Sequence, residues 1–356
     1  MKKLVIALAF GFMILSAINV TAAETKVQGR VYSHWMMDMT DGADSYNEFD
    51  ITRTYVTIKS KLSDFTSVRI TTDIRQTEQN TSEFNGYEMI LKYAYLDWQP
   101  KFGQGNVTLR MGLQPTLYID NMNGIWGRRY MMKTIGDEES FLTTADMGAG
   151  LQFNLGEKGK YGMAGINVWN GTKYTNLEEL NKNKDFSGFV AFNPFTNNND
   201  LKNSQLIAQY YYGVQNREFA VNEDASDYNR NLLSVGGIMV YRNIFDFGAD
   251  LNWYSEGQGA GNDDEKQTGF SFFGTLYLES LAENAPMFRT LNLFGRVDMY
   301  DPNTDLDNNA DTRIVGGVEC APIKGVKASV NLRSISFEDD ATDSETYLYV
   351  NTLVKF

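Results

Sequence analysis

The chain has 356 residues, a formal net charge of −13 and a mean hydropathy of −0.37. This acidic balance argues against nucleic acid as a partner, because a surface that binds nucleic acid carries excess positive charge. The single cysteine, Cys320, excludes an internal disulfide, so any compact fold depends on other interactions.

The first 23 residues have the pattern of a cleaved signal peptide. Lys2 and Lys3 precede an apolar run over residues 4–20, and three small residues follow it. A basic start, an apolar centre and a small-residue end are typical of a secretory signal, and the run is short for a membrane anchor. We therefore expect an exported protein that retains residues 24–356, or 356 − 23 = 333 residues.

Alternation with a period of two residues runs through the rest of the chain. In "FDFGADLNWY", residues 245–254, apolar side chains occupy one face and Asp246, Asp250 and Asn252 occupy the other. Such alternation predicts β-strands, and segments of about ten residues suit tilted strands that cross a membrane. The chain after residue 23 has no apolar run long enough to cross as a helix.

The connections between these segments alternate in length. Short turns such as "RNIF", residues 242–245, follow even-numbered segments, and long polar loops such as residues 255–267 follow odd-numbered ones. Short turns at one end and long loops at the other are typical of an outer-membrane barrel, with the turns in the periplasm.

There are sixteen such segments. Divided among them, residues 24–356 give about 21 residues for each segment together with its connection. The predicted fold is therefore all-β: a transmembrane antiparallel β-barrel of sixteen strands, wide enough for an aqueous channel. The strands are expected to start near Val27, Phe49, Thr66, Tyr87, Asn106, Ala145, Tyr161, Phe186, Ser204, Asn231, Phe245, Gln267, Arg289, Thr312, Val326 and Thr346.

The last ten residues, "YLYVNTLVKF", read as a strand that ends on an aromatic residue. Leu348, Val350, Val354 and Phe356 share one face of this strand. A closed barrel pairs its last strand with its first, so we expect this segment to close the barrel and Phe356 to lie in the periplasmic aromatic girdle. The pattern also resembles the C-terminal signature by which the barrel-assembly machinery recognises outer-membrane proteins.

Several stretches resemble Gram-negative porins, specifically the phosphate-selective porin O/P-like family. The resemblance is clearest in the first half, and the second half resembles the family mainly in its strand rhythm. It implies a sixteen-stranded barrel, commonly a homotrimer, that passes small solutes. The stretches are "NEFDITRTYVTIKSKLSDFTSVRITTDIR" (47–75), "LKYAYLDWQP" (91–100), "LRMGLQPT" (109–116), "WGRRYMMKT" (126–134) and "TADMGAGLQF" (144–153).

Residues 117–144 form the candidate constriction loop. This segment is more apolar than a freely solvated loop, and the resemblance implies that the third outer loop folds into the lumen. The alternative is a loop that packs over the rim or contacts a partner subunit. Its charged residues are Asp120, Arg128, Arg129, Lys133, Asp137, Glu138 and Glu139.

The less apolar faces of the first strands predict a basic lining of the pore. Charged side chains at membrane depth are expected to face water. Placing Arg or Lys on the lipid-facing side at the bilayer midplane would cost about 2–4 kcal/mol of stability. Facing the acids of the loop across the pore, these arginines would filter ions electrostatically. The alternative is that they are ordinary solvated charges of the lumen with no role in selectivity. The predicted pore-lining residues are Arg30, Arg53, Arg69, Arg75 and Arg110, and Lys59 shares their inward parity.

The hypothesis is a porin in the outer membrane that lets small hydrophilic solutes and ions diffuse passively. The net negative charge differs from the densely basic lining that the resemblance to phosphate-selective porins implies. A channel selective for anions, phosphate or sugars is kept as an alternative. A barrel that acts as an adhesin or structural surface through its acidic outer loops is another. Lipid and lipopolysaccharide are the expected surroundings, and no cofactor or metal is expected. Catalysis is disfavoured, because His34 is the only histidine.

Overall fold

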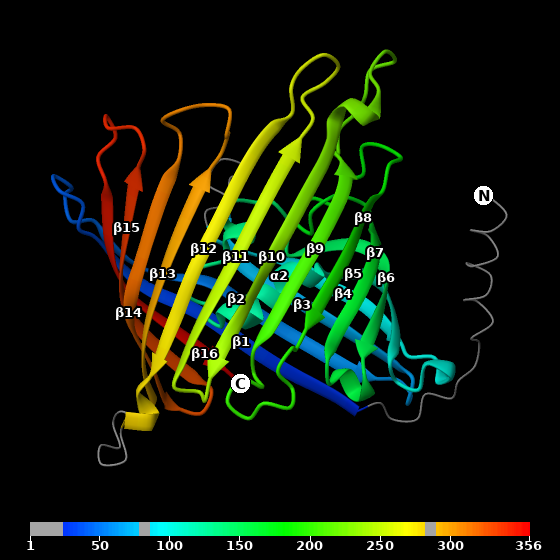
Figure 1. Cartoon of the computed structure of the whole chain (residues 1–356), viewed down its shortest axis with the longest axis horizontal. Helices are drawn as coiled ribbons and strands as arrows, with labels where there is room; N and C mark the ends of the chain where they lie inside the picture. The colour runs from blue at the N-terminus through cyan, green and yellow to red at the C-terminus, as the bar shows by residue number, and fades with distance from the viewer. Residues whose placement is uncertain (1–23, 78–85, 282–289) are drawn as a thin grey trace.

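The structure, a computed structural model, describes residues 24–77, 86–281 and 290–356. The predicted signal peptide, residues 1–23, and the predicted strand start at Arg289 lie outside these ranges. Within the described part, sixteen antiparallel strands form a closed barrel in which each strand pairs with its neighbours in the chain, and β1 also pairs with β16 (Figure 1). Of the described helices, none is long and apolar enough to cross a membrane.

The predicted barrel and its strand count are confirmed. The strands are β1 (Glu24–Asp38), β2 (Asn47–Lys61), β3 (Thr66–Gln76), β4 (Tyr87–Trp98), β5 (Val107–Pro115), β6 (Ala145–Leu155), β7 (Gly162–Trp169), β8 (Asp185–Phe192), β9 (Gln205–Val214), β10 (Asn229–Tyr241), β11 (Phe245–Glu256), β12 (Glu265–Tyr277), β13 (Leu291–Asp301), β14 (Asp311–Ile323), β15 (Val326–Phe337) and β16 (Glu345–Lys355).

The helices are short and lie in the connections. The connection between β5 and β6 contains α2 (Leu117–Trp126) and α3 (Ile135–Glu138). Four 3₁₀ helices occur elsewhere in the described ranges: η1 (Lys101–Gly103), η2 (Glu157–Gly159), η3 (Ala225–Tyr228) and η4 (Leu278–Leu281).

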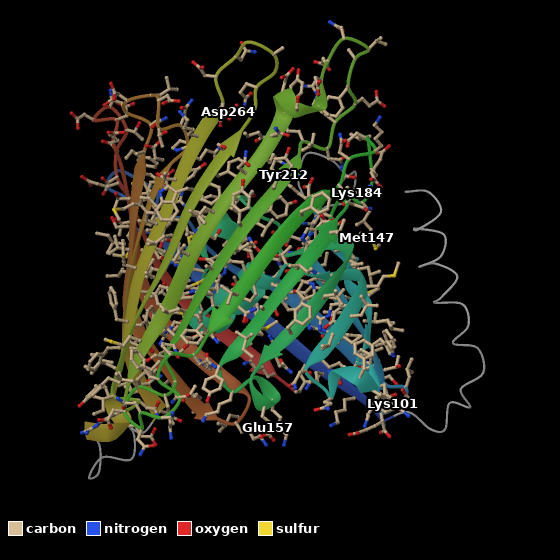
Figure 2. All side chains as sticks on the ribbon, turned by 45° about the vertical axis from the view of Figure 1, so that its right-hand side comes forward. Lys101, Met147, Glu157, Lys184, Tyr212 and Asp264 are labelled. Atoms are coloured by element: carbon tan, nitrogen blue, oxygen red, sulfur yellow. The ribbon has the colours of Figure 1, made fainter. Side chains whose placement is uncertain are left out.

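The two ends of the barrel differ, as the connection lengths predict. Figure 2 shows Asp264 in a long loop at one end, and Glu157 and Lys101 in the connections at the other. The chain's C-terminus lies at the end that carries Glu157 and Lys101 (Figure 1).

Closure of the barrel brings the first and last strands together. Arg30 is opposite Lys355 in the register, and the main chains of Gly29 and Phe356 exchange two hydrogen bonds of 2.8 and 3.1 Å. The ring of Phe356 covers Gly29 so closely that a Cβ there would come within 2.2 Å of it. An aromatic ring over a strand glycine is a recognised way to pin strand register. Phe356 therefore reinforces closure from the outer surface, on the face predicted to carry the closure signal.

The outward faces of the strands are apolar and exposed, and many inward faces are polar and buried. In β11, Phe247 and Trp253 point outward, and Asp250 and Asn252 on the other face are 1% exposed. Polar residues that face into a wide barrel would be solvated unless something covered them. The segment that covers them is the connection between β5 and β6.

Candidate functional site: the lumen and its inserted segment

Residues 117–144 lie inside the barrel, with α2 beside β9, β10 and β11 (Figure 1). Trp126 is 2% exposed and meets Phe273 edge-to-face at 5.2 Å between ring centroids. Phe141 stacks on Tyr254 of β11 at 5.8 Å. Burial of large aromatic side chains is strongly favourable, so these contacts explain why the sequence of this segment is too apolar for a solvated loop.

Hydrogen bonds attach the segment to the strands that it covers. The hydroxyl of Tyr118 donates to Asp250 at 2.8 Å, and the hydroxyl of Tyr130 donates to Glu319 at 2.8 Å. Arg128 donates to the hydroxyl of Thr275 at 3.0 Å. Hydrogen bonds to charged groups contribute more than neutral ones, so each carboxylate is a strong anchor.

Arginines of the wall also bind the main chain of the segment. Arg296 pairs with Asp298 through two hydrogen bonds of 2.7 Å and donates to the carbonyl of Lys133 at 2.8 Å. On the neighbouring strand β15, Arg333 donates to the carbonyl of Met131 at 2.9 Å. We call the inward faces of β10–β14, where charged groups are buried and paired, the covered wall.

Three of the predicted loop acids are engaged in ion pairs. Within the segment, Asp137 pairs with Arg129 at 3.0 Å, and Glu138 pairs with Lys133 at 3.5 Å. Glu139 pairs with Arg313 of β14. Burial raises the pKa of Glu139 above its usual range, and Arg313 opposes that rise. These acids hold the segment together and to the wall.

A cavity of about 450 Å³ separates the segment from the opposite side of the barrel. Strands β1, β2, β3, β4 and β16 supply its wall on that side, and we call their inward faces the open wall. On the side of the segment, α2 presents Asp120, Asn123 and Gly124. The charged residues that line the cavity are Arg30, Lys59, Arg69, Lys92, Asp120, Arg129 and Lys355.

Four cations of the open wall form no ion pair with any described carboxylate: Arg30, Lys59, Arg69 and Lys355. Arg30 is opposite Lys355 in the register, and Lys59 is opposite Arg69. The guanidinium of Arg69 lies 4.5 Å from the ring centroid of Tyr93. We call these four residues the cation cluster.

Of the five predicted pore-lining arginines, only Arg30 and Arg69 belong to this cluster. The other three are paired with acids of the first strands: Arg53 with Asp73 at 2.9 Å, Arg75 with Glu88 at 2.8 Å, and Arg110 with Asp97 at 2.7 Å. All five lie on inward faces, as the alternation predicts. What the alternation does not reveal is which of them have a carboxylate neighbour.

Of the two lysines of the cluster, only Lys59 is predicted from the sequence to face inward. Lys59 is on the same face of β2 as Arg53, so the alternation of the strand is sufficient to predict that its side chain faces inward. Lys355 is missing from the predicted set. It lies two residues beyond Leu353, which is also on the inward face and 4% exposed. Its proximity to Arg30 depends on barrel closure, which no local pattern encodes.

Several inward aromatic residues pack against neighbouring side chains. Trp169 is 1% exposed and donates to Ser187. Tyr32 is 5% exposed and lies against Tyr55 and Tyr130. His34 lies beside Tyr349, at 5.3 Å between ring centroids. Among the described residues, no group of three or more acids, histidines or cysteines is arranged to hold a metal ion.

No protein-family model and no curated protein sequence matches the chain. Solved structures are similar along nearly the whole chain. An anion-selective porin from Comamonas acidovorans is 12% identical with a TM-score of 0.65, covering 94% of this chain and 100% of that one. OprB of Pseudomonas putida is 9% identical with a TM-score of 0.65, covering 93% and 94%.

The outer-membrane channel DcaP of Acinetobacter baumannii is also similar. It is 11% identical with a TM-score of 0.60, and the match covers 94% of this chain and 98% of that one. The chain therefore has the fold of the outer-membrane porins.

Proposed function

We propose that the protein is an outer-membrane porin, a water-filled channel through which small hydrophilic solutes and ions diffuse passively. Residues 117–144 narrow the lumen, and the cation cluster biases passage toward anions. The observation that carries the proposal is the cavity between α2 and the open wall, which is lined by the four cations of the cluster and by Asp120. Charged side chains that line a narrow pore set its ion preference.

The electrostatic filter in this proposal differs from the one that the sequence predicts. Asp137, Glu138 and Glu139 are neutralised by neighbouring cations, so Asp120 is the acid of the segment that opposes the cation cluster. The similar porin from Comamonas acidovorans is described as anion-selective, which supports the same preference here. Phosphate selectivity is not proposed, because nothing in the cluster distinguishes phosphate from other anions.

We further propose that three copies of the chain assemble in the outer membrane. One similar structure is a trimer form of OmpT from Vibrio cholerae, which supports a homotrimer in the outer membrane. Export through a cleaved signal peptide and insertion through the C-terminal strand would bring the chain there. In this proposal the protein carries out no catalysis.

Single-channel current in a planar bilayer under a salt gradient tests the proposal. We expect step-like conductance and a reversal potential that favours anions. A reversal potential that favours cations would contradict the role of the cation cluster. Folded protein that forms no channel would overturn the porin proposal and favour a role for the acidic outer loops.

A further inference from the structure

The exposed edge of α2 carries few side-chain atoms. In this helix of ten residues, Leu117, Tyr118, Met122 and Trp126 are buried. The exposed positions of the helix are Asp120 and Gly124, and Gly127 continues the same edge as the C-cap. Positions that are three or four residues apart share one face of a helix, so this edge points away from the covered wall.

Gly124 has no conformational reason to be glycine. Its φ lies outside the left-handed region, unlike that of Gly127, whose φ of +67° suits the end of a helix. Within a helix, glycine is about 1 kcal/mol less favourable than alanine. No neighbour requires a glycine there either, because a Cβ at this position would meet nothing within 4 Å.

The open space beside Gly124 belongs to the lumen. Gly124 lines the cavity beside the open wall and also a second cavity of about 570 Å³, which reaches Asn193 and Lys202 near the connection between β8 and β9. Asp120 lines both cavities as well. The two cavities therefore meet at this edge of α2, which lies inside the barrel (Figure 1).

We infer that Gly124 is a specificity-determining residue that sets the width of the passage by having no side chain. Any side chain at this position would project into the lumen, toward the wall that carries the cation cluster. The inference rests on the proposed function, since width matters only if solutes pass through the lumen. It adds that this helix gives up stability to keep the lumen open.

The test combines conductance with stability, because the two readouts should move in opposite directions. Gly124→Ala should raise the thermal unfolding temperature of the folded barrel, since alanine favours the helix, yet lower the single-channel conductance. Gly124→Leu should lower conductance further and reduce the size of sugars that enter proteoliposomes. A purely structural role would not lower conductance while stability rises.

Gly316 offers a matched control. A Cβ added to Gly316 would also meet nothing within 4 Å, but this glycine lies on β14 on the face opposite to Val315, which is buried, and lines neither cavity. Gly316→Leu should leave conductance and size exclusion unchanged. Wild-type conductance in Gly124→Leu, or an equal loss in Gly316→Leu, would overturn the inference. A wild-type protein without any channel would instead overturn the proposed function.

Discussion

The covered wall and the open wall are made of the same alternating strands, but they use charged residues differently. On the covered wall, charged groups such as Arg296 and Asp298 are 3% and 1% exposed, and each has a partner. On the open wall, Arg30 and Lys59 are exposed and have no carboxylate partner among the described residues. Charge therefore attaches residues 117–144 on one side, whereas on the other side the four residues of the cation cluster have no carboxylate partner among the described residues.

The difference follows from the cost of burial. A charge that loses its water needs a partner, and removing one member of a buried pair leaves the other uncompensated. A charge that keeps its water needs none. The comparison predicts that substitutions on the covered wall change stability, and that substitutions on the open wall change selectivity.

The largest effect is expected from breaking the buried pair of Arg296 and Asp298. Arg296→Met should destabilise the folded protein by about 3–5 kcal/mol, because Asp298 would remain buried without its partner and Lys133 would lose a donor. Thermal unfolding of the detergent-folded barrel measures this loss. Arg242→Met, which breaks an exposed pair with Asp200, is the matched control and should leave the unfolding temperature nearly unchanged, because solvent screens an exposed ion pair. Equal effects of the two substitutions would contradict the contrast between the walls.

A smaller loss of stability is expected at Tyr118. Tyr118→Phe should cost about 1–3 kcal/mol, because Asp250 loses its hydroxyl donor and keeps the amide of Asn252. The loosened helix should also increase current noise in single-channel recordings. Tyr212→Phe is a suitable control, since its exposed hydroxyl donates to Asn229 near the barrel surface. Quiet, wild-type current from Tyr118→Phe would show that this bond does not hold α2 in place.

The cation cluster should contribute more to ion selectivity than to stability. Replacing Arg30, Lys59, Arg69 and Lys355 together by Gln should move the reversal potential toward cations, because the lining of the cavity would lose four positive charges. Stability should change by no more than about 0.5 kcal/mol for each exposed position. Reversal potential under a salt gradient and thermal unfolding provide the two readouts. An unchanged reversal potential would locate the filter elsewhere in the lumen.

The smallest effect is expected from a single neutralisation on the opposite side of the cavity. Asp120→Asn should shift the reversal potential further toward anions, with the fold intact, because it removes the carboxylate that faces the cation cluster. Raising the salt concentration should weaken the shift, since exposed charges are screened over about 10 Å at 0.1 M. Glu138→Gln, at an acid already paired with Lys133, is the control and should shift the potential less.

Much of the fold was predictable from local alternation. The strand starts differ from the predicted ones by at most three residues, as at Val27 against Glu24. The inward parity of Arg30, Arg53 and Arg110 was predictable for the same reason. A strand's faces are fixed by its own sequence, because successive side chains point to opposite sides.

The pairing of charges was less predictable, because it depends on register and on bulges. The register between β3 and β4 shifts after Thr71, and the shift leaves Lys92 and Tyr93 both buried in the lumen. Lys92 then lies 3.9 Å from Asp73, which also pairs with Arg53. A shift of one residue in one strand thus places Lys92 beside a carboxylate that already pairs with Arg53.

Local sequence was sufficient to predict the class of fold, the faces of the strands and the position of the long apolar connection, because each depends on residues close together in the chain. Which charges have no carboxylate partner depends instead on the tertiary structure. Barrel closure places Lys355 opposite Arg30, although the two residues belong to the last and the first strand of the chain. Insertion of residues 117–144 then buries the charges of the covered wall and leaves the cation cluster beside the cavity. Both outcomes depend on contacts between distant segments, which only the folded chain brings together.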